Sequence, residues 1–281
     1  MRVVSLFPAA TEMVAALGGA GLLVGVSDQC DWPPAVRALP RVTRSSLDPA
    51  LTAAGIDRAM ARAQAGGTPS GSIDEELLRR LQPDLVIGQS LCEVCAIGGD
   101  AAATAMARLD SRPASLTLHA HTLEEVLRDI QRVADALDLS SEGDELVRGM
   151  RYRLRVVRNR TPIPPPRVLV LEWLDPPYVA GHWVPELVRI AGGEDVGNPP
   201  GARSVARPWE ALAALSPDLV VIALCGFDLP RAHREFAGLR APEAAPLFVR
   251  PPKFLDGNAY TSRPGPRLAE AAELLALLMR G

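Results

Sequence analysis

The sequence predicts an α/β protein in which two Rossmann-like α/β lobes are joined by one long helix, with a ligand cleft between the lobes. The first observation is a repeated phrase: residues 81–95 read LQPDLVIGQSLCEVC and residues 215–227 read LSPDLVVIALCGF. Each copy places Pro-Asp before a short β-branched run, which indicates a turn followed by a buried strand of a parallel sheet. The second observation is a restart of the chain, because residues 167–171 (RVLVL) echo residues 2–6 (RVVSL).

Strand and helix signals alternate through the first half of the chain. Gly18-Gly19 ends the first helix, since glycine readily adopts the left-handed conformation that closes a helix. Apolar residues recur on one face from Val126 to Leu137, which predicts an amphipathic helix. We expect strands at 3–7, 22–27, 84–87 and 114–118, and helices at 8–17, 56–65, 72 or 74 to 81, 101–109 and 123–137.

A long helix rich in Arg and Glu begins at Ser140 or Ser141 and runs to Arg158. The proline cluster at 162–166 ends it, because proline cannot continue a helix. The second half then predicts strands at 167–171, 218–222 and 246–249, and helices at 185–193, 209–215, 229–239 and 265–278. The predicted domains are an N-terminal α/β lobe (1–139), a connecting backbone helix (140–160) and a C-terminal α/β lobe (161–281).

Composition excludes several classes of partner. A net charge of −3 and a pI near 5.9 give no electrostatic basis for binding nucleic acid. No apolar run approaches the roughly 18 residues of a membrane span, so no membrane insertion is expected. Met1-Arg2 leads directly into the first predicted strand without a secretory signal, so we expect a cytoplasmic protein.

The four cysteines form a candidate metal site. Cys30, Cys92, Cys95 and Cys225 all follow predicted strands, and ligands of α/β sheets gather beyond the carboxyl ends of strands. Thiolates suit zinc or an iron–sulfur cluster, and a Cys-x-x-Cys pair in a cytosolic protein usually binds metal or does redox chemistry. The alternative is that free cysteines simply pack in the core, as they often do.

Aromatic side chains gather after the predicted strands. Five of the seven Trp and Tyr residues are assigned to loops at the cleft edge: Trp32, Trp173, Tyr178, Trp183 and Tyr260. Flat aromatic faces suit a broad, flat, mostly apolar ligand such as a corrin or porphyrin. For any one of them, packing beneath a loop is an equally good explanation.

His182 and Arg263 are the polar candidates in the second half. A neutral imidazole at His182 could be an axial ligand for cobalt or iron, although a lone histidine more often hydrogen-bonds a loop. Arg263 precedes the last helix, and a phosphate or carboxylate of a ligand would be its natural partner.

Several segments together carry a family resemblance: SLFPAATEMVAALGG (5–19), VGVSDQCDWPP (24–34), PDLVIGQ (83–89) and RVLVLEW (167–173). They resemble the helical-backbone metal-receptor proteins, the periplasmic-binding-protein-like substrate-binding proteins of cobalamin, haem and iron-siderophore ABC importers. The resemblance covers nearly the whole chain and is closest to the cobalamin-binding branch. It implies a ligand held between lobes that a rigid connecting helix keeps almost fixed.

The resemblance implies a corrinoid such as cobalamin, or another small metal-containing ligand, in the cleft. Exported relatives carry a signal peptide, and importer-coupled relatives lack this cysteine set, so both features argue against a transporter partner. The ligand-binding candidates are Phe7, Pro8, Asp31, Trp32, Trp173, Tyr178, His182, Trp183, Tyr260 and Arg263.

No sequence signature of catalysis is found. Gly-x-Ser-x-Gly, a phosphate-binding loop, His-Glu-x-x-His and Gly-x-Gly-x-x-Gly after the first strand are all missing. The sequence therefore predicts a non-enzymatic corrinoid-binding protein. Two alternatives stay open: a cysteine-ligated metal or iron–sulfur protein on a receptor fold, and a thiol-dependent enzyme.

Overall fold

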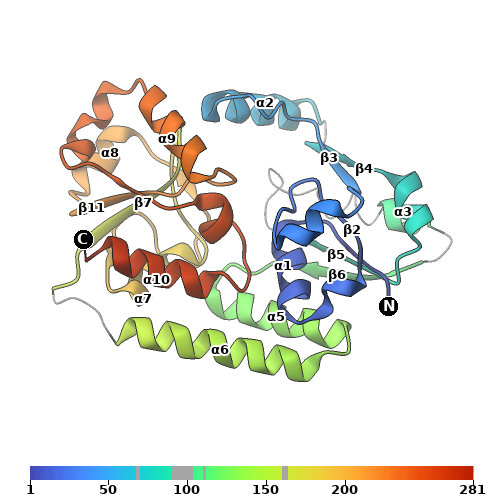
Figure 1. The fold of residues 1–281 in the computed structure, drawn as a ribbon. Coiled ribbons are helices and arrows are strands. Elements are labelled where there is room, and N and C mark those ends of the chain that lie inside the picture. The colour runs from blue at the N-terminus through green and yellow to red at the C-terminus, as the bar shows by residue number, and fades with distance from the viewer. Residues whose placement is uncertain (68–69, 90–103, 110–111, 160–163, 281) are drawn as a thin grey trace. The chain divides into compact units, whose positions relative to one another are not determined.

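A computed structural model describes residues 1–67, 70–89, 104–109, 112–159 and 164–280 (Figure 1). The chain divides into two compact units. The N-terminal unit comprises Met1–Leu51, Arg58–Ala120 and Glu125–Arg148, and the C-terminal unit comprises Thr52–Asp57, His121–Glu124 and Gly149–Gly281. No helix in the described ranges combines the length and apolarity that a bilayer crossing requires.

A four-stranded sheet forms the centre of the N-terminal unit, with the strand order β2-β1-β5-β6. Its strands are β1 (Val3–Ser5), β2 (Leu23–Val26), β5 (Leu85–Gln89) and β6 (Ala114–Leu118). All neighbours pair in parallel, as predicted. Val3, Val4 and Val86 are at most 1% exposed, which is why these strands read as short apolar runs rather than alternating ones.

Helices and a two-stranded antiparallel sheet complete this part of the chain: α1 (Pro8–Ala16), η1 (Gly19–Leu22), η2 (Pro34–Ala38), β3 (Thr43–Ser45), α2 (Ala53–Ala65), β4 (Gly71–Ile73), α3 (Glu75–Leu81), α5 (Leu123–Ala136) and α6 (Ser140–Arg158). Gly18 follows α1 in the left-handed conformation, with φ of 80°, which confirms the predicted stop. Asp74 caps α3, because its carboxylate accepts the Leu77 N–H at 2.8 Å.

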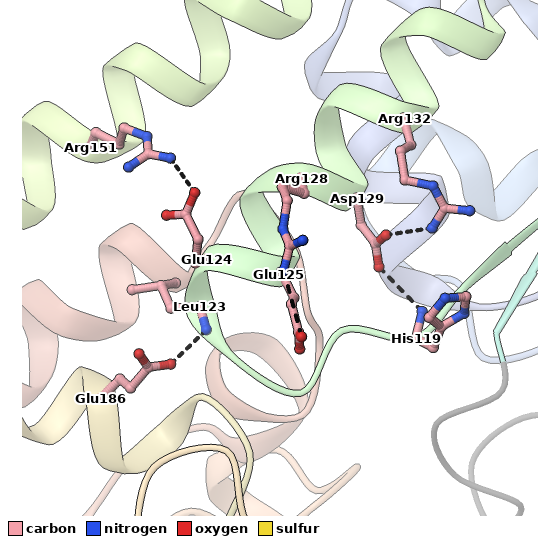
Figure 2. Close-up of polar contacts among 9 residues, drawn as sticks. All are labelled: His119, Leu123, Glu124, Glu125, Arg128, Asp129, Arg132, Arg151 and Glu186. Carbon is pink, nitrogen blue, oxygen red and sulfur yellow. Dashed lines mark hydrogen bonds and ion pairs between the residues drawn. The ribbon is translucent and has the colours of Figure 1, made fainter.

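Helix α5 confirms the predicted amphipathic pattern. The four residues of its predicted apolar face are at most 5% exposed: Val126, Ile130, Val133 and Leu137. Polar contacts also hold this helix in place (Figure 2). Asp129 accepts the His119 N–H at 3.2 Å and the Arg132 guanidinium at 2.7 Å, which ties the helix to the end of β6.

A mixed sheet forms the centre of the C-terminal unit, with the order β10-β8-β7-β11-β12 and β9 paired to β7. Its strands are β7 (Arg167–Leu174), β8 (Pro177–Val179), β9 (Glu194–Asp195), β10 (Val205–Ala206), β11 (Leu219–Ile222) and β12 (Lys253–Phe254). Strands β7, β9, β11 and β12 are parallel, whereas β8 and β10 run antiparallel to their neighbours. The restart of the chain at 167 is therefore a second α/β unit, as predicted.

Helices cover both faces of this sheet, with α7 and α10 on one face and α8 and α9 on the other (Figure 1). The helical elements are α7 (Val184–Ala191), α8 (Trp209–Ala214), α9 (Leu229–Gly238), η3 (Pro242–Phe248), η4 (Gly257–Thr261) and α10 (Leu268–Leu278). Leu171, Leu212 and Ile222 are fully buried in one core cluster that β7, β11, α8 and α9 share.

The strand predicted at 246–249 is wrong. Those residues lie in and just after the 3-10 helix η3, and the strand beside β11 is β12. Pro242 and Pro246 favour helical turns at this point, and the turn buries Leu247 in the core without a sheet partner. The run was too short for its apolar pattern to distinguish the two structures.

Candidate functional site

Three segments meet at the carboxyl edge of the parallel strands in the C-terminal unit. The end of β7 holds the segment after β11, because Cys225 N–H donates to the Glu172 carbonyl at 2.9 Å. The segment after β12 joins them, since Asn258 N–H donates to the Phe227 carbonyl at 3.1 Å. We call residues 223–227 and 256–263 the carboxyl-edge loops. This edge is where α/β sheets commonly bind ligands.

Arg263 lies buried in the second carboxyl-edge loop, with 5% of its surface exposed. Its guanidinium donates to the Asn258 side-chain carbonyl at 2.8 Å, which orients the planar group. Burial raises the pKa of the nearby Asp256, whose carboxylate accepts the Ala259 N–H at 2.7 Å and so begins η4. The loop thus holds a buried, oriented cation near the Asp256 carboxylate.

Tyr260 is held at both ends. Its hydroxyl donates to Glu270 at 3.0 Å, and the Arg267 guanidinium lies over its ring at 4.6 Å from the centroid. Tyr260 is half-buried.

His182 has an unusual backbone, with φ of 54° in the left-handed region that non-glycine residues seldom adopt. Two hydrogen bonds impose this conformation: His182 N–H donates to the Ala202 carbonyl at 2.6 Å, and Gly201 N–H donates to the His182 carbonyl at 2.9 Å. The imidazole stacks on His121, with ring centroids 5.4 Å apart. A left-handed backbone that is fixed in this way sets the direction of the Cα–Cβ bond, and backbone strain of this kind clusters at functional sites.

The imidazole of His182 is neutral at physiological pH. Burial, together with the nearby His121 and Arg203, lowers its pKa to about 4. A neutral imidazole keeps a nitrogen lone pair that a metal can accept, whereas an imidazolium does not.

We expect NMR titration of the His182 Cε1–H resonance, assigned by its loss in H182Q, to give a midpoint near pH 4. Because this pKa lies below the ordinary value of about 6.5, the unfolded state binds the proton first as pH falls. The contribution of His182 to the free energy of unfolding is therefore at its full value above about pH 6.5, and it decreases as the pH falls toward 4. A midpoint near 6.5 would show an exposed, unperturbed ring.

Two of the aromatic residues assigned to loops lie in strands, which corrects that prediction. Trp173 on β7 and Tyr178 on β8 are cross-strand partners in an antiparallel hairpin. The Trp173 ring packs on Phe227 at 5.1 Å between centroids. Asp175-Pro176 forms the turn between the two strands.

Trp183 is buried immediately before α7, with 3% of its surface exposed. Its indole N–H donates to the Thr261 carbonyl at 2.9 Å, which joins the His182 segment to the carboxyl-edge loops. The neighbouring rings of His182 and Trp183 are 5.6 Å apart. Trp183 therefore positions this segment more than it offers a free face.

The predicted ligand-binding and metal-binding residues of the N-terminal unit differ from one another in burial and in their contacts. Phe7 is buried, Pro8 is the first residue of α1, and Trp32 is 46% exposed. Cys30 is 1% exposed, and its thiol lies 3.1 Å from the Thr11 hydroxyl. Asp31 is half-buried, and its carbonyl accepts the Arg37 side chain at 3.1 Å.

The four-cysteine site stays a prediction, because Cys92 and Cys95 lie outside the described residues. Cys30 belongs to the N-terminal unit and Cys225 to the C-terminal unit. Among residues with described positions, no group of three or more His, Cys, Asp or Glu side chains could hold a metal ion.

His121 is a site residue that the sequence did not identify. It stands 61 positions before His182, and no spacing rule connects the two. The same is true of Arg203, which contributes to the low pKa of His182 from the loop before β10. These contacts depend on tertiary packing and leave no local signal.

Solved structures share this fold over nearly the whole chain. The periplasmic haem-binding protein HutB of Vibrio cholerae matches with a TM-score of 0.72 and 19% identity, covering 100% of this chain and 99% of that chain. The periplasmic haem-binding protein RhuT from Roseiflexus sp. RS-1, in apo form, matches with a TM-score of 0.70 and 22% identity, covering 99% of this chain and 97% of that chain. The periplasmic vitamin B12 binding protein BtuF of Vibrio cholerae matches with a TM-score of 0.67 and 19% identity, covering 99% of this chain and 96% of that chain. They confirm the predicted two-lobe α/β fold.

No curated protein matches this chain in sequence. A family described as periplasmic binding protein does match, over residues 3–228. This match contradicts the cytoplasmic location that we predicted from the first residues.

The comparisons also give no support to zinc or an iron–sulfur cluster. Periplasmic binding proteins bind without catalysis, so the expectation of a non-enzymatic protein is confirmed and a thiol-dependent enzyme is not supported. With most of its length matched, this chain belongs to the periplasmic binding protein family.

Proposed function

We propose that this protein binds a metal-centred tetrapyrrole, a corrinoid such as cobalamin in the first place and haem as the alternative, and releases it unchanged. The observation that carries the proposal is the neutral, half-buried imidazole of His182, held on a fixed left-handed backbone. Support also comes from relatives of the same fold that are titled as haem-binding and vitamin B12 binding proteins.

His182 would supply the axial ligand to cobalt or iron. Its low pKa keeps the imidazole neutral across the physiological range, so no proton has to leave before the metal binds. The stacked His121 ring and the two backbone hydrogen bonds restrict its orientation. A ligand atom that is already oriented loses less entropy on binding.

The rest of the candidate set would contact the macrocycle and its edge. Tyr260 and Trp173 offer partly accessible rings for the flat face. Arg263 would meet a propionate of haem or the phosphate of cobalamin, where a buried guanidinium is strongly favoured. Phe7, Pro8, Asp31 and Trp32 of the N-terminal unit stay predicted ligand-binding residues.

Delivery to an ABC transporter is part of the proposal. The expectation against a transporter partner rested partly on a cytoplasmic location, which the family match contradicts. A matching structure from Listeria monocytogenes EGD-e is titled an ABC transporter substrate-binding protein, with a TM-score of 0.72 and 17% identity.

Binding is tested by titrating the purified protein with aquocobalamin, whose cobalt-bound water an imidazole can displace, and, separately, with ferric haem. Tryptophan fluorescence and visible difference spectra are the readouts. We expect saturable quenching with one of the two, and about tenfold or weaker affinity in H182A, because tenfold corresponds to about 1.4 kcal/mol, a modest share of a metal–ligand bond. The matched control is H119A, which removes an exposed imidazole from the other unit. No saturable response to either compound would remove the proposal.

A further inference from the structure

Asp195 is a buried carboxyl outside the candidate site. It ends β9, and its Oδ1 atom accepts the Gly197 N–H at 2.8 Å and the Asn198 N–H at 3.0 Å. Its Oδ2 atom is buried and has no hydrogen-bond partner in the described part of the chain. A carboxylate in this position is poorly solvated, so its ionised form is disfavoured.

The loop that follows, residues 196–204, is organised by this carboxyl. Asn198 is 8% exposed, and its side-chain amide donates to the Arg203 carbonyl at 2.9 Å. Asp195 therefore holds one end of the loop directly and the other end through Asn198. We call residues 196–204 the 196–204 loop.

The same loop holds the backbone of His182. Gly201 and Ala202 make the two backbone hydrogen bonds that fix its left-handed conformation. The packing is close, since a Cβ on Gly181 would lie 2.5 Å from the Ala202 oxygen and from the Ser204 nitrogen. The geometry of the candidate site thus depends on the loop staying closed.

The closed 196–204 loop buries two polar groups whose unfavourable burial opening would relieve. At its far end the Ser204 hydroxyl is also buried, and none of the residues with described positions hydrogen-bonds to it. Unsatisfied buried polar groups oppose the closed state, and opening would expose both Asp195 and Ser204 to water.

Burial is the dominant cause that raises the pKa of Asp195 to about 6, against the two backbone N–H groups, which lower it. Titratable and charged groups also stand on the surrounding elements: Arg167 and Glu172 on β7, Tyr178 on β8, Glu186 and Arg189 on α7, Glu194 on β9, and His182, Arg203 and Arg207 in the adjacent loops. Arg167 and Glu194 pair with each other at 3.7 Å. Burial and backbone hydrogen bonds therefore set the titration.

We propose that the 196–204 loop is a proton-dependent latch: protonated Asp195 keeps it closed, ionised Asp195 lets it open more often, and opening releases the backbone of His182. The inference does not depend on the identity of the ligand, because the latch is a property of the unliganded chain. Its direction follows from linkage. Asp195 regains its ordinary acidity when the loop opens, so rising pH between about 4 and 6 favours the open state.

Hydrogen exchange of the full-length protein at pH 5.0 to 7.5 tests the latch, after correction for the intrinsic pH dependence of exchange. The opening constant of peptides over 181–184 and 196–204 is expected to rise about tenfold over this range, as linkage gives for a carboxyl of pKa about 6 when closed. A peptide over β11 is the internal reference and should show no such rise.

Variants separate Asp195 from its neighbour. D195N should abolish the rise, whereas E194Q, which removes an equal charge from the exposed adjacent residue, should keep it. A flat wild-type series overturns the proposal, even if D195N does not fold. A rise that persists in D195N, or one confined to 196–204 without 181–184, also overturns it.

Discussion

Replacing Gly257 with alanine is expected to destabilise the protein by about 3 kcal/mol or more, the upper range for forcing extra volume into a packed interior. A Cβ at this position would overlap the Leu224 carbonyl oxygen and lie 2.7 Å from the Ala223 carbonyl carbon. These are backbone atoms at the end of a buried strand, so no side-chain rotation relieves the contact. Gly257 is also the first residue of η4, so relaxation would displace the loop that carries Arg263.

Gly149 provides the matched control. It lies within α6, and a Cβ there meets no atom within 4 Å. G149A should stabilise the protein by roughly 0.5–1 kcal/mol, since alanine loses less backbone entropy than glycine in a helix. Urea denaturation of both variants measures the difference. A G257A protein within about 1 kcal/mol of wild type would show that these segments are not as closely packed as described.

Replacing Glu186 with alanine is expected to cost about 2 kcal/mol, the typical contribution of a hydrogen bond to a charged group. Its carboxylate accepts the Leu123 N–H at 2.6 Å, at the first residue of α5 (Figure 2). Helix-initial N–H groups have no acceptor within their own helix, so a carboxylate from α7 satisfies one of them. Without it, a donor at a largely buried residue loses its partner.

Glu124, which directly follows Leu123 in the sequence, is the control for Glu186. It pairs with Arg151 at 2.6 Å, but both side chains are more than half exposed, so E124A should change stability by less than about 0.5 kcal/mol. Thermal and urea unfolding of E186A, E186Q and E124A distinguish the two cases. Equal small effects in E186A and E124A would contradict a capping role for Glu186.

Local chemistry accounts for the parts of the fold that the sequence predicted. Three signals each depend only on residues close by in the sequence: the apolar period of α5, the glycine after α1 and the proline cluster after α6. The β7–β8 hairpin was missed because the predicted strand ended at residue 171, before the turn at Asp175-Pro176, and Pro177 begins the second strand, a position that tolerates proline. The strand expected at 246–249 was wrong because four apolar residues fit a 3-10 turn equally well.

The candidate site was predicted less completely, for a physical reason. His182, Tyr260 and Arg263 follow strands and could be selected by position in the chain. The stacking of His121 on His182, and the loop that fixes the left-handed backbone, are contacts between distant segments. The neutral state of His182 comes from burial, which no sequence pattern reports. The resemblance supplied the family, and the location predicted from the first residues was wrong.

The most direct test of the central claim is electron paramagnetic resonance of cob(II)inamide bound to the protein. Cobinamide has no nucleotide base of its own, so a nitrogen on its axial position must come from the protein. We predict that each cobalt hyperfine line splits into a nitrogen triplet, and that the splitting disappears in H182A but not in H119A. Bound cobinamide without nitrogen splitting, or splitting that survives in H182A, would contradict His182 as the metal ligand.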